Sequence, residues 1–218
     1  MADMIASIKN ILLVPKCKCC RKPADKDNLC NNCAAEMFKQ RIPPAEQKIT
    51  KKFELVDDVY ASYYYKTAAR DAVLKAKYSN PAAFLNSLLA DISIDIQNIL
   101  EQNNIDMVVA VPCHKSKYYT QEYDLPEEMA KRIAEYTGKE YSECVKKVRK
   151  TEKQHDLPKD KRRANLINAF EATVDLTGKN ILITDDVVTT GYTLSAVATE
   201  LKLAGAEKVY AWVYTYNT

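Results

Sequence analysis

One segment, Ile181–Thr193, restricts the possible folds of this chain more than any other. It reads Ile-Leu-Ile-Thr-Asp-Asp-Val-Val-Thr-Thr-Gly-Tyr-Thr: an apolar run that ends in two adjacent acids, a threonine-rich turn, and the start of a helical pattern. Ligands of open α/β sheets bind beyond the carboxyl ends of the strands, where the chain passes into a helix. The segment therefore predicts both a strand–turn–helix unit and a binding site.

The residue types in this segment indicate what the site would bind. A turn at a helix N-terminus presents backbone N–H groups to an anion, and Gly191 allows the backbone to approach a phosphate closely. The threonine hydroxyls of Thr189–Thr193 add hydrogen-bond donors. Asp185 and Asp186 would repel phosphate, but they can accept hydrogen bonds from vicinal hydroxyls. Together these groups predict a site for a sugar 5′-phosphate; the alternative is a solvated strand end followed by threonines that only cap the helix.

The remaining apolar pattern indicates a parallel α/β sheet. Buried strands are predicted at Ile105–Val111, Asn180–Thr184 and Lys208–Tyr214, with helical patterns between them. The aromatic run Tyr60–Tyr65 favours an edge or covering strand. Further helices are predicted in four segments: Thr67–Lys77, Pro81–Gln102, Glu127–Tyr136 before Gly138, and Leu194–Ala204 before Gly205.

A polar stretch, Arg41–Lys52, contains two adjacent prolines and predicts a joint between two parts of the chain. We expect an N-terminal unit over residues 1–46 and an α/β domain over residues 50–218. Met1–Pro15 has the spacing of a short amphipathic helix and lacks the apolar core and cleavage site of a signal peptide.

Composition restricts the function classes. The chain has 32 basic and 29 acidic residues, a net charge of +3, which argues against a surface that coats nucleic acid generally. No apolar run approaches membrane-spanning length. We therefore expect a cytoplasmic protein.

Five of the seven cysteines lie between Cys17 and Cys33. Two Cys-x-x-Cys pairs, Cys17/Cys20 and Cys30/Cys33, are separated by nine residues, and four such thiolates fit a closed tetrahedral zinc site of structural type. Cys19 could replace Cys17 as a ligand. The alternatives are free structural thiols, a redox pair or an iron–sulfur cluster.

Lys146–Arg163 carries nine basic residues against three acids. The pattern is typical of a solvated face, and it also fits a loop that closes over a polyanionic ligand, or a weak contact with DNA phosphates. His155 within it and His114 elsewhere are lone histidines, and neither is assigned a catalytic role.

The Ile181–Thr193 segment resembles the phosphoribosyl pyrophosphate motif of type I phosphoribosyltransferases. The whole chain is similar to the ComF family, which includes ComFC and GntX relatives and places a four-cysteine zinc knuckle before such a domain. The similarity also covers Lys77-Tyr78, Val111-Pro112 and the run from Arg149 through Thr151 and Gln154 to Phe170.

The resemblance implies roles for particular residues. Asp185 and Asp186 would hold the ribose hydroxyls, and Thr189–Thr193 would wrap the 5′-phosphate. The residues that bind phosphoribosyl pyrophosphate would be Asp185, Asp186, Val187, Val188, Thr189, Thr190, Gly191, Tyr192 and Thr193. Cys113, His114 and Lys115 would face a pyrophosphate carried with Mg²⁺, and Arg149, Lys150 and Gln154 would belong to a flexible loop. The partners implied are phosphoribosyl pyrophosphate, an unknown acceptor and proteins of competence or DNA processing.

One segment departs from the family pattern. Family members commonly have Arg-Gly after the pyrophosphate loop, whereas this chain aligns Gln121 and Glu122 there. The exchange removes a cation and adds a carboxylate. Ligand binding without transfer, by a factor that acts in DNA uptake, is therefore the alternative to a phosphoribosyltransferase.

Overall fold

A computed structural model describes residues 16–17, 20, 22–24, 30–78, 82–114, 124–152 and 157–217. Within these ranges, the helices are α2 (Asn31–Phe38), the 3-10 turn η1 (Pro44–Glu46), α3 (Thr67–Tyr78), α4 (Ala82–Gln102), α5 (Leu125–Thr137), α6 (Lys159–Ala164) and α7 (Tyr192–Leu203). The strands are β1 (Asp58–Tyr64), β2 (Met107–Ala110), β3 (Glu140–Tyr141), β4 (Val145–Lys147), β5 (Phe170–Ala172), β6 (Asn180–Val188) and β7 (Lys208–Tyr216). The helix predicted for Met1–Pro15 lies outside the described residues.

Five parallel strands form the central sheet in the order β1-β7-β6-β2-β3, with β1 at one edge, as the aromatic run predicted. Leu182 of β6 pairs with Val108 on one side and Tyr210 on the other, so β6 lies in the middle of the sheet. Buried residues fill both neighbouring strands because helices cover both faces of the sheet. The predicted parallel α/β fold is confirmed.

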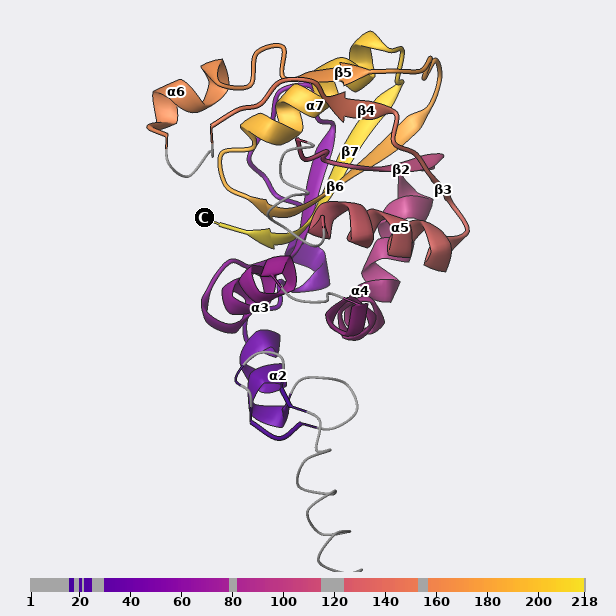
Figure 1. Ribbon diagram of the computed structural model, residues 1–218. Helices are drawn as coiled ribbons and strands as arrows, with labels where there is room; N and C mark the ends of the chain where they lie inside the picture. Colours follow the sequence, from indigo (N-terminus) through magenta and orange to yellow (C-terminus); the bar gives the residue numbers. More distant parts are fainter. Residues whose placement is uncertain are drawn as a thin grey trace, which may run out of the picture.

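Strand alternation divides the core into two layers. Leu182 and Trp212 pack with α3, α4 and α5 on one face, whereas Ile181 and Ile183 pack with α7 on the other. The short antiparallel pair β4–β5 lies on the α7 side (Figure 1).

The long strands continue past their predicted ends. We predicted β6 to stop at Thr184, but it runs to Val188 because β7 continues beside it, with Val188 opposite Tyr216. The apolar pattern ends at the acids, whereas backbone pairing does not depend on apolar side chains. The acid pair therefore lies within a strand rather than after it.

The joint after α2 is fixed to the domain. Its residues run antiparallel along the edge strand β1, with bridges from Arg41 to Tyr63 and from Lys48 to Tyr60. Arg41 Nη2 lies 2.5 Å from Asp95 Oδ2 of α4, and Gln47 Nε2 donates to the same oxygen at 2.8 Å. This buried polar cluster ties the joint to the helical layer.

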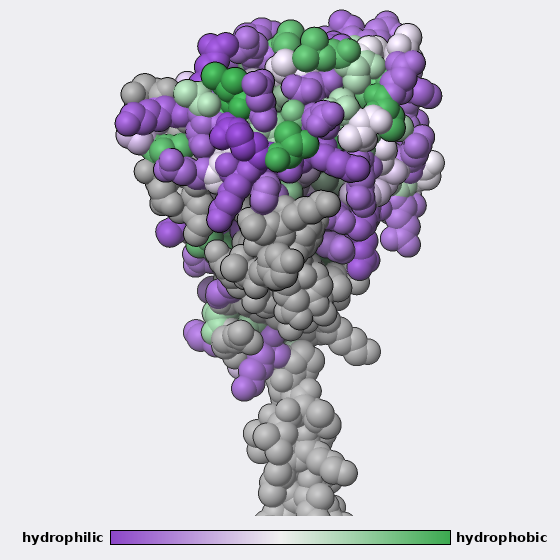
Figure 2. Space-filling view, turned by 45° about the horizontal axis from the view of Figure 1, so that its top comes forward, coloured by the Kyte–Doolittle hydropathy of each residue, from purple (hydrophilic) through white to green (hydrophobic). Residues whose placement is uncertain are grey.

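The face shown in Figure 2 is mostly hydrophilic, with apolar side chains in separate small groups. Exposed apolar residues on the segments around β4, β5 and α7 include Val148, Ile167, Val174 and Leu203. None of the helices within the described ranges combines the length and apolar composition that crossing a bilayer requires.

Candidate functional site

The two adjacent aspartates lie in the carboxyl-terminal half of β6, with Asp185 opposite Val213 of β7. Thr215 Oγ1 donates to the backbone oxygen of Asp186 at 2.9 Å, which fixes the strand at this point. The side chain of Asp186 is buried and that of Asp185 is half-buried. Two carboxyl groups are therefore withdrawn from water at neighbouring positions of one strand.

Lys77, in the last turn of α3, forms an ion pair with this acid pair. Its Nζ lies 2.5 Å from Asp186 Oδ2, and the two side chains are 30% and 8% exposed. Burial alone would lower the pKa of Lys77, but the charge and hydrogen bond of Asp186, together with the charge of Asp185, outweigh it and raise the pKa. Lys77 is therefore a fixed positive charge beside the aspartates.

For Asp185, burial outweighs the favourable interactions and determines the direction of the pKa shift. Burial and the neighbouring charge of Asp186 raise its pKa well above the usual range, and Asp124 at the start of α5 adds to this. The N–H of Asp186, which donates to Asp185 Oδ1 at 2.8 Å, and the charge of Lys77 act against the shift without cancelling it. Asp185 therefore holds a proton to higher pH than an ordinary aspartic acid.

After β6 the chain turns through Thr189 and Thr190 into α7, whose N-cap is Gly191. Gly191 has a left-handed φ of 79° and no side chain with which to cap the helix. The first N–H groups of any α-helix lack partners within the helix, so the start of α7 presents donors at the end of β6.

Residues of the joint pack against this turn. Lys51 Nζ donates to the backbone oxygen of Thr189 at 3.1 Å. A Cβ atom at Gly191 would lie 1.9 Å from Cδ1 of the buried Phe53 ring. Gly191 is thus required by protein packing, in addition to any approach of a phosphate.

The predicted pyrophosphate loop follows the neighbouring strand. The N–H of Val111 donates to the backbone oxygen of Thr184 at 2.9 Å, so the residues after β2 leave the sheet beside the acid pair. Cys113 and His114 are half-buried there. Lys115, Gln121 and Glu122 lie outside the described residues.

Arg149 closes the base of the predicted flexible loop. Its Nη2 donates to the backbone oxygens of Asn165 and Ile167, both at 2.8 Å, and Asn165 exchanges two hydrogen bonds with the backbone of Glu152. Lys150 is exposed, whereas Gln154 and His155 lie outside the described residues. The structure thus gives Arg149 a role in holding the two arms of the loop together.

The four cysteines predicted as metal ligands come together. The Sγ atoms of Cys17, Cys20, Cys30 and Cys33 all lie within 4.8 Å of one another. Cys17 and Cys33 are buried, and the N–H of Cys20 donates to Cys17 Sγ at 3.4 Å, a turn typical of a Cys-x-x-Cys pair. Cys19, the alternative ligand, lies outside the described residues.

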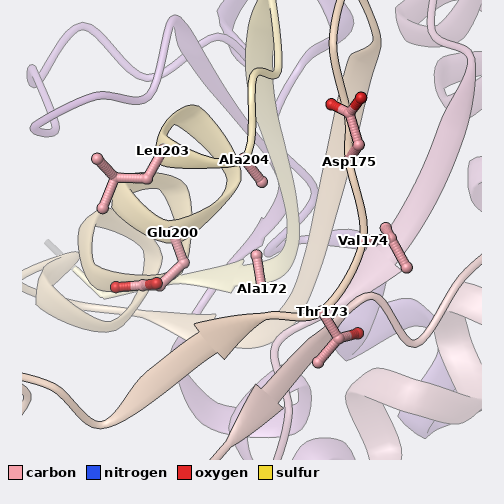
Figure 3. A pocket seen from close by; sticks show the side chains of 7 residues that line it. All are labelled: Ala172, Thr173, Val174, Asp175, Glu200, Leu203 and Ala204. Atoms are coloured by element: carbon pink, nitrogen blue, oxygen red, sulfur yellow. The ribbon is translucent and has the colours of Figure 1, made fainter.

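A shallow cavity of about 390 Å³ opens elsewhere, between the end of α7 and the chain after β5 (Figure 3). Its lining residues are Ala172, Thr173, Val174, Asp175, Glu200, Leu203 and Ala204. Because α7 contributes only residues of its last turn and its C-cap to the lining, the cavity is separate from the turn at the start of that helix.

Comparison with known proteins agrees with this geometry. The family model described as phosphoribosyl transferase domain matches residues 127–217, a range that includes the acid pair, the turn and α7. The DNA utilization protein YhgH of Escherichia coli K12 is 25% identical over 201 residues, which cover 90% of this chain and 82% of that protein. Competence protein F of Haemophilus influenzae is 26% identical over 111 residues, 49% of this chain and 48% of that protein.

These relatives, the phosphoribosyltransferase match and the four-cysteine cluster together fit the ComF family, which the sequence resembles. Outside the family, a ribose-phosphate pyrophosphokinase of Pyrococcus furiosus is 38% identical over 84 residues, which cover 38% of this chain and 25% of that enzyme.

Sequence reasoning missed three side chains at this candidate site: Lys77, Lys51 and Phe53. The resemblance included Lys77 but gave it no role, Lys51 was treated only as part of the polar joint, and Phe53 was not singled out. All three lie far along the chain from β6 and carry no spacing pattern. A basic residue in an otherwise alanine-rich helix face was the one available signal for Lys77.

Proposed function

We propose that this protein binds phosphoribosyl pyrophosphate with Mg²⁺ at the junction of β6 and α7, and transfers the phosphoribosyl group to an acceptor of unknown identity. One observation carries the proposal: an acid pair, of which Asp186 is buried and Asp185 half-buried, and a glycine-capped helix N-terminus occupy the same strand–turn–helix unit. Acceptors for sugar hydroxyls and donors for a phosphate thus lie within a few residues of each other.

In this proposal Asp185 and Asp186 accept hydrogen bonds from the ribose hydroxyls. The backbone and hydroxyl groups of Thr189–Thr193 surround the 5′-phosphate, and the first N–H groups of α7 add their dipole. The match to the phosphoribosyl transferase model and to a ribose-phosphate pyrophosphokinase supports a phosphorylated ribose as the ligand.

The pyrophosphate would lie toward Cys113, His114 and Lys115 and carry Mg²⁺, a hard cation that bridges phosphate oxygens and keeps several waters. The bond between ribose C1 and the pyrophosphate oxygen breaks as the acceptor adds from the opposite face. The protein positions both reactants and stabilises the departing charge, and Arg149, Lys150 and Gln154 belong to the loop over this region. We assign no general base.

A second candidate function is a phosphoribosyl pyrophosphate-binding factor in DNA uptake or processing that does not catalyse transfer. The names of two relatives, a DNA utilization protein and a competence protein, favour it. The exchange of a family Arg-Gly for Gln121 and Glu122 favours it as well, because a carboxylate near pyrophosphate opposes turnover.

We also propose that Cys17, Cys20, Cys30 and Cys33 hold a structural zinc ion. Their sulfur atoms are close enough to share one ion, and four thiolates leave no position open for water. A cytoplasmic location and a division into residues 1–46 and 50–218 complete the proposal.

Thermal unfolding in the presence of phosphoribosyl pyrophosphate and Mg²⁺ tests the binding site, because a ligand that binds only the native state raises the melting temperature. The shift is expected in the wild type, absent in Asp185→Asn/Asp186→Asn, and retained in Asp71→Asn, an exposed acid of α3. An equal shift in the double variant would refute the site. Release of pyrophosphate with a panel of nucleobases then separates an enzyme from a binding factor.

A further inference from the structure

The acid pair is held by a cation from a different part of the chain. Lys77 reaches Asp186 from the last turn of α3, and both side chains are largely withdrawn from water. Removing two charges from water is costly, and a buried pair repays that cost only with good geometry. Lys77 Nζ and Asp186 Oδ2 are in direct contact, so the two charges are paired rather than buried separately.

We propose that Lys77 is a positioning residue of the phosphoribosyl pyrophosphate site, which holds the side chain of Asp186 in place through their ion pair and offsets the negative charge that the ligand meets there. This inference rests on the proposed function. A lysine at this position gives the site its counter-charge before any metal arrives.

The argument is electrostatic. Two adjacent carboxylates would accept hydrogen bonds from ribose, but they would also repel the phosphate groups on either side of that ribose. A unit positive charge in contact with one carboxylate weakens this repulsion. Where the surroundings are partly desolvated, the affinity for the ligand rises by roughly several-fold to tens of fold. Lys77 therefore lets one site combine hydroxyl acceptors with an anionic ligand.

The other ionisable groups around this lysine come from four elements. Asp185 lies beside it on β6, Asp124 precedes α5, and Tyr65 follows β1. His114 follows β2, the strand next to β6. Removing the charge of Lys77 raises the pKa of Asp185 further, so the titration of this carboxyl differs between the wild type and a neutral Lys77 variant.

A purely structural role is the competing explanation, since the ion pair also ties α3 to β6. The two roles differ in their dependence on pH. If the ion pair between Lys77 and Asp186 only held α3 against β6, its loss would weaken binding by the same factor at every pH. Loss of a counter-charge would weaken it more at high pH, because burial and the charge of Asp186 already raise the pKa of Asp185 and removal of Lys77 raises it further, so a larger share of this carboxyl is protonated at low pH than at high pH.

The test measures the affinity for phosphoribosyl pyrophosphate with excess Mg²⁺ by calorimetry at several pH values from 6 to 8. Lys77→Met keeps the aliphatic stem, Lys77→Gln keeps a hydrogen-bond donor, and Lys77→Arg keeps the charge. Lys75→Met, an exposed lysine in the same helical turn, is the matched control. Circular dichroism checks that each protein is folded at the assay temperature.

We expect Lys77→Met and Lys77→Gln to bind about tenfold more weakly or worse at pH 8, with a smaller deficit at pH 6. Lys77→Arg should recover most of the affinity, and Lys75→Met should match the wild type. A deficit that is equal at all pH values, or neutral variants that bind as Lys75→Met does, would overturn the inference while leaving the binding site intact. Failure of the wild type to bind would instead refute the proposed function.

Discussion

Replacing Gly191 by alanine should destabilise the protein by two separable effects. A non-glycine residue at the left-handed φ of 79° costs about 1–2 kcal/mol. The new methyl group would also lie 1.9 Å from Cδ1 of Phe53, and overpacking of this kind typically costs about 1–3 kcal/mol. We therefore expect a loss of about 2–5 kcal/mol in the free energy of unfolding.

Two comparisons separate these contributions in urea denaturation. Gly178→Ala has a similar φ of 72°, but its methyl group would meet no atom within 4 Å, so it measures the backbone cost alone. Phe53→Ala removes the ring, so Gly191→Ala should cost less in that background, by about 1–3 kcal/mol.

The reasoning would be refuted if Gly191→Ala and Gly178→Ala had the same effect, or if the effects of Phe53→Ala and Gly191→Ala were additive. Ligand-induced thermal shifts of the same variants would report on the site. Gly191→Ala should reduce the shift because it displaces the turn that begins α7, whereas Gly178→Ala lies in the turn before β6 and should leave the shift unchanged.

Three other outcomes are expected. Asp95→Ala should lower the free energy of unfolding by about 3–5 kcal/mol in urea denaturation, since it leaves the Arg41 guanidinium without its buried carboxylate partner; a loss below 1 kcal/mol would contradict this. Elemental analysis should find about one zinc ion per purified chain and almost none in Cys17→Ser/Cys33→Ser; equal zinc in both proteins would exclude the cluster. Arg149→Ala should speed proteolytic cleavage before Asn165 while changing the free energy of unfolding by only about 1 kcal/mol. Unchanged cleavage would show that the hydrogen bonds from Arg149 to Asn165 and Ile167 do not hold the loop.

The order of elements could be predicted from the sequence because each is a local pattern. The apolar run of β6, the acids and the glycine at the start of α7 are consecutive, and helical and strand periods differ clearly on either side. The cysteine cluster could also be predicted from the sequence, since the spacing of two Cys-x-x-Cys pairs such as Cys17/Cys20 restricts the possible arrangements of the four thiols.

The side chains that surround these elements could not be predicted in the same way. Lys77 and Phe53 contact Asp186 and Gly191 across more than a hundred residues, and no periodicity links such positions. The strand end at Val188 was missed for a different reason. Side-chain pattern reports burial, whereas the length of β6 is set by the backbone of β7 beside it.

The joint between the cysteine unit and the domain acts physically as part of the domain. Arg41 and Gln47 both reach Asp95, and Ile42 is buried in the core on the α7 side. Farther along, Phe53 packs against the turn before α7, and Glu54 forms an ion pair with Arg163 of α6.

A fragment that begins at residue 50 would keep the contacts of Phe53 and Glu54 but lose those of Arg41, Ile42 and Gln47. Asp95 would then retain a buried carboxylate without these two partners, at a cost of several kcal/mol. The polar, proline-containing joint marks a change in composition along the sequence, and Arg41, Ile42 and Gln47 contact the domain although they lie before residue 50. The segment that leads from the cysteine unit therefore helps to hold the turn before α7 in place, through Lys51 and Phe53.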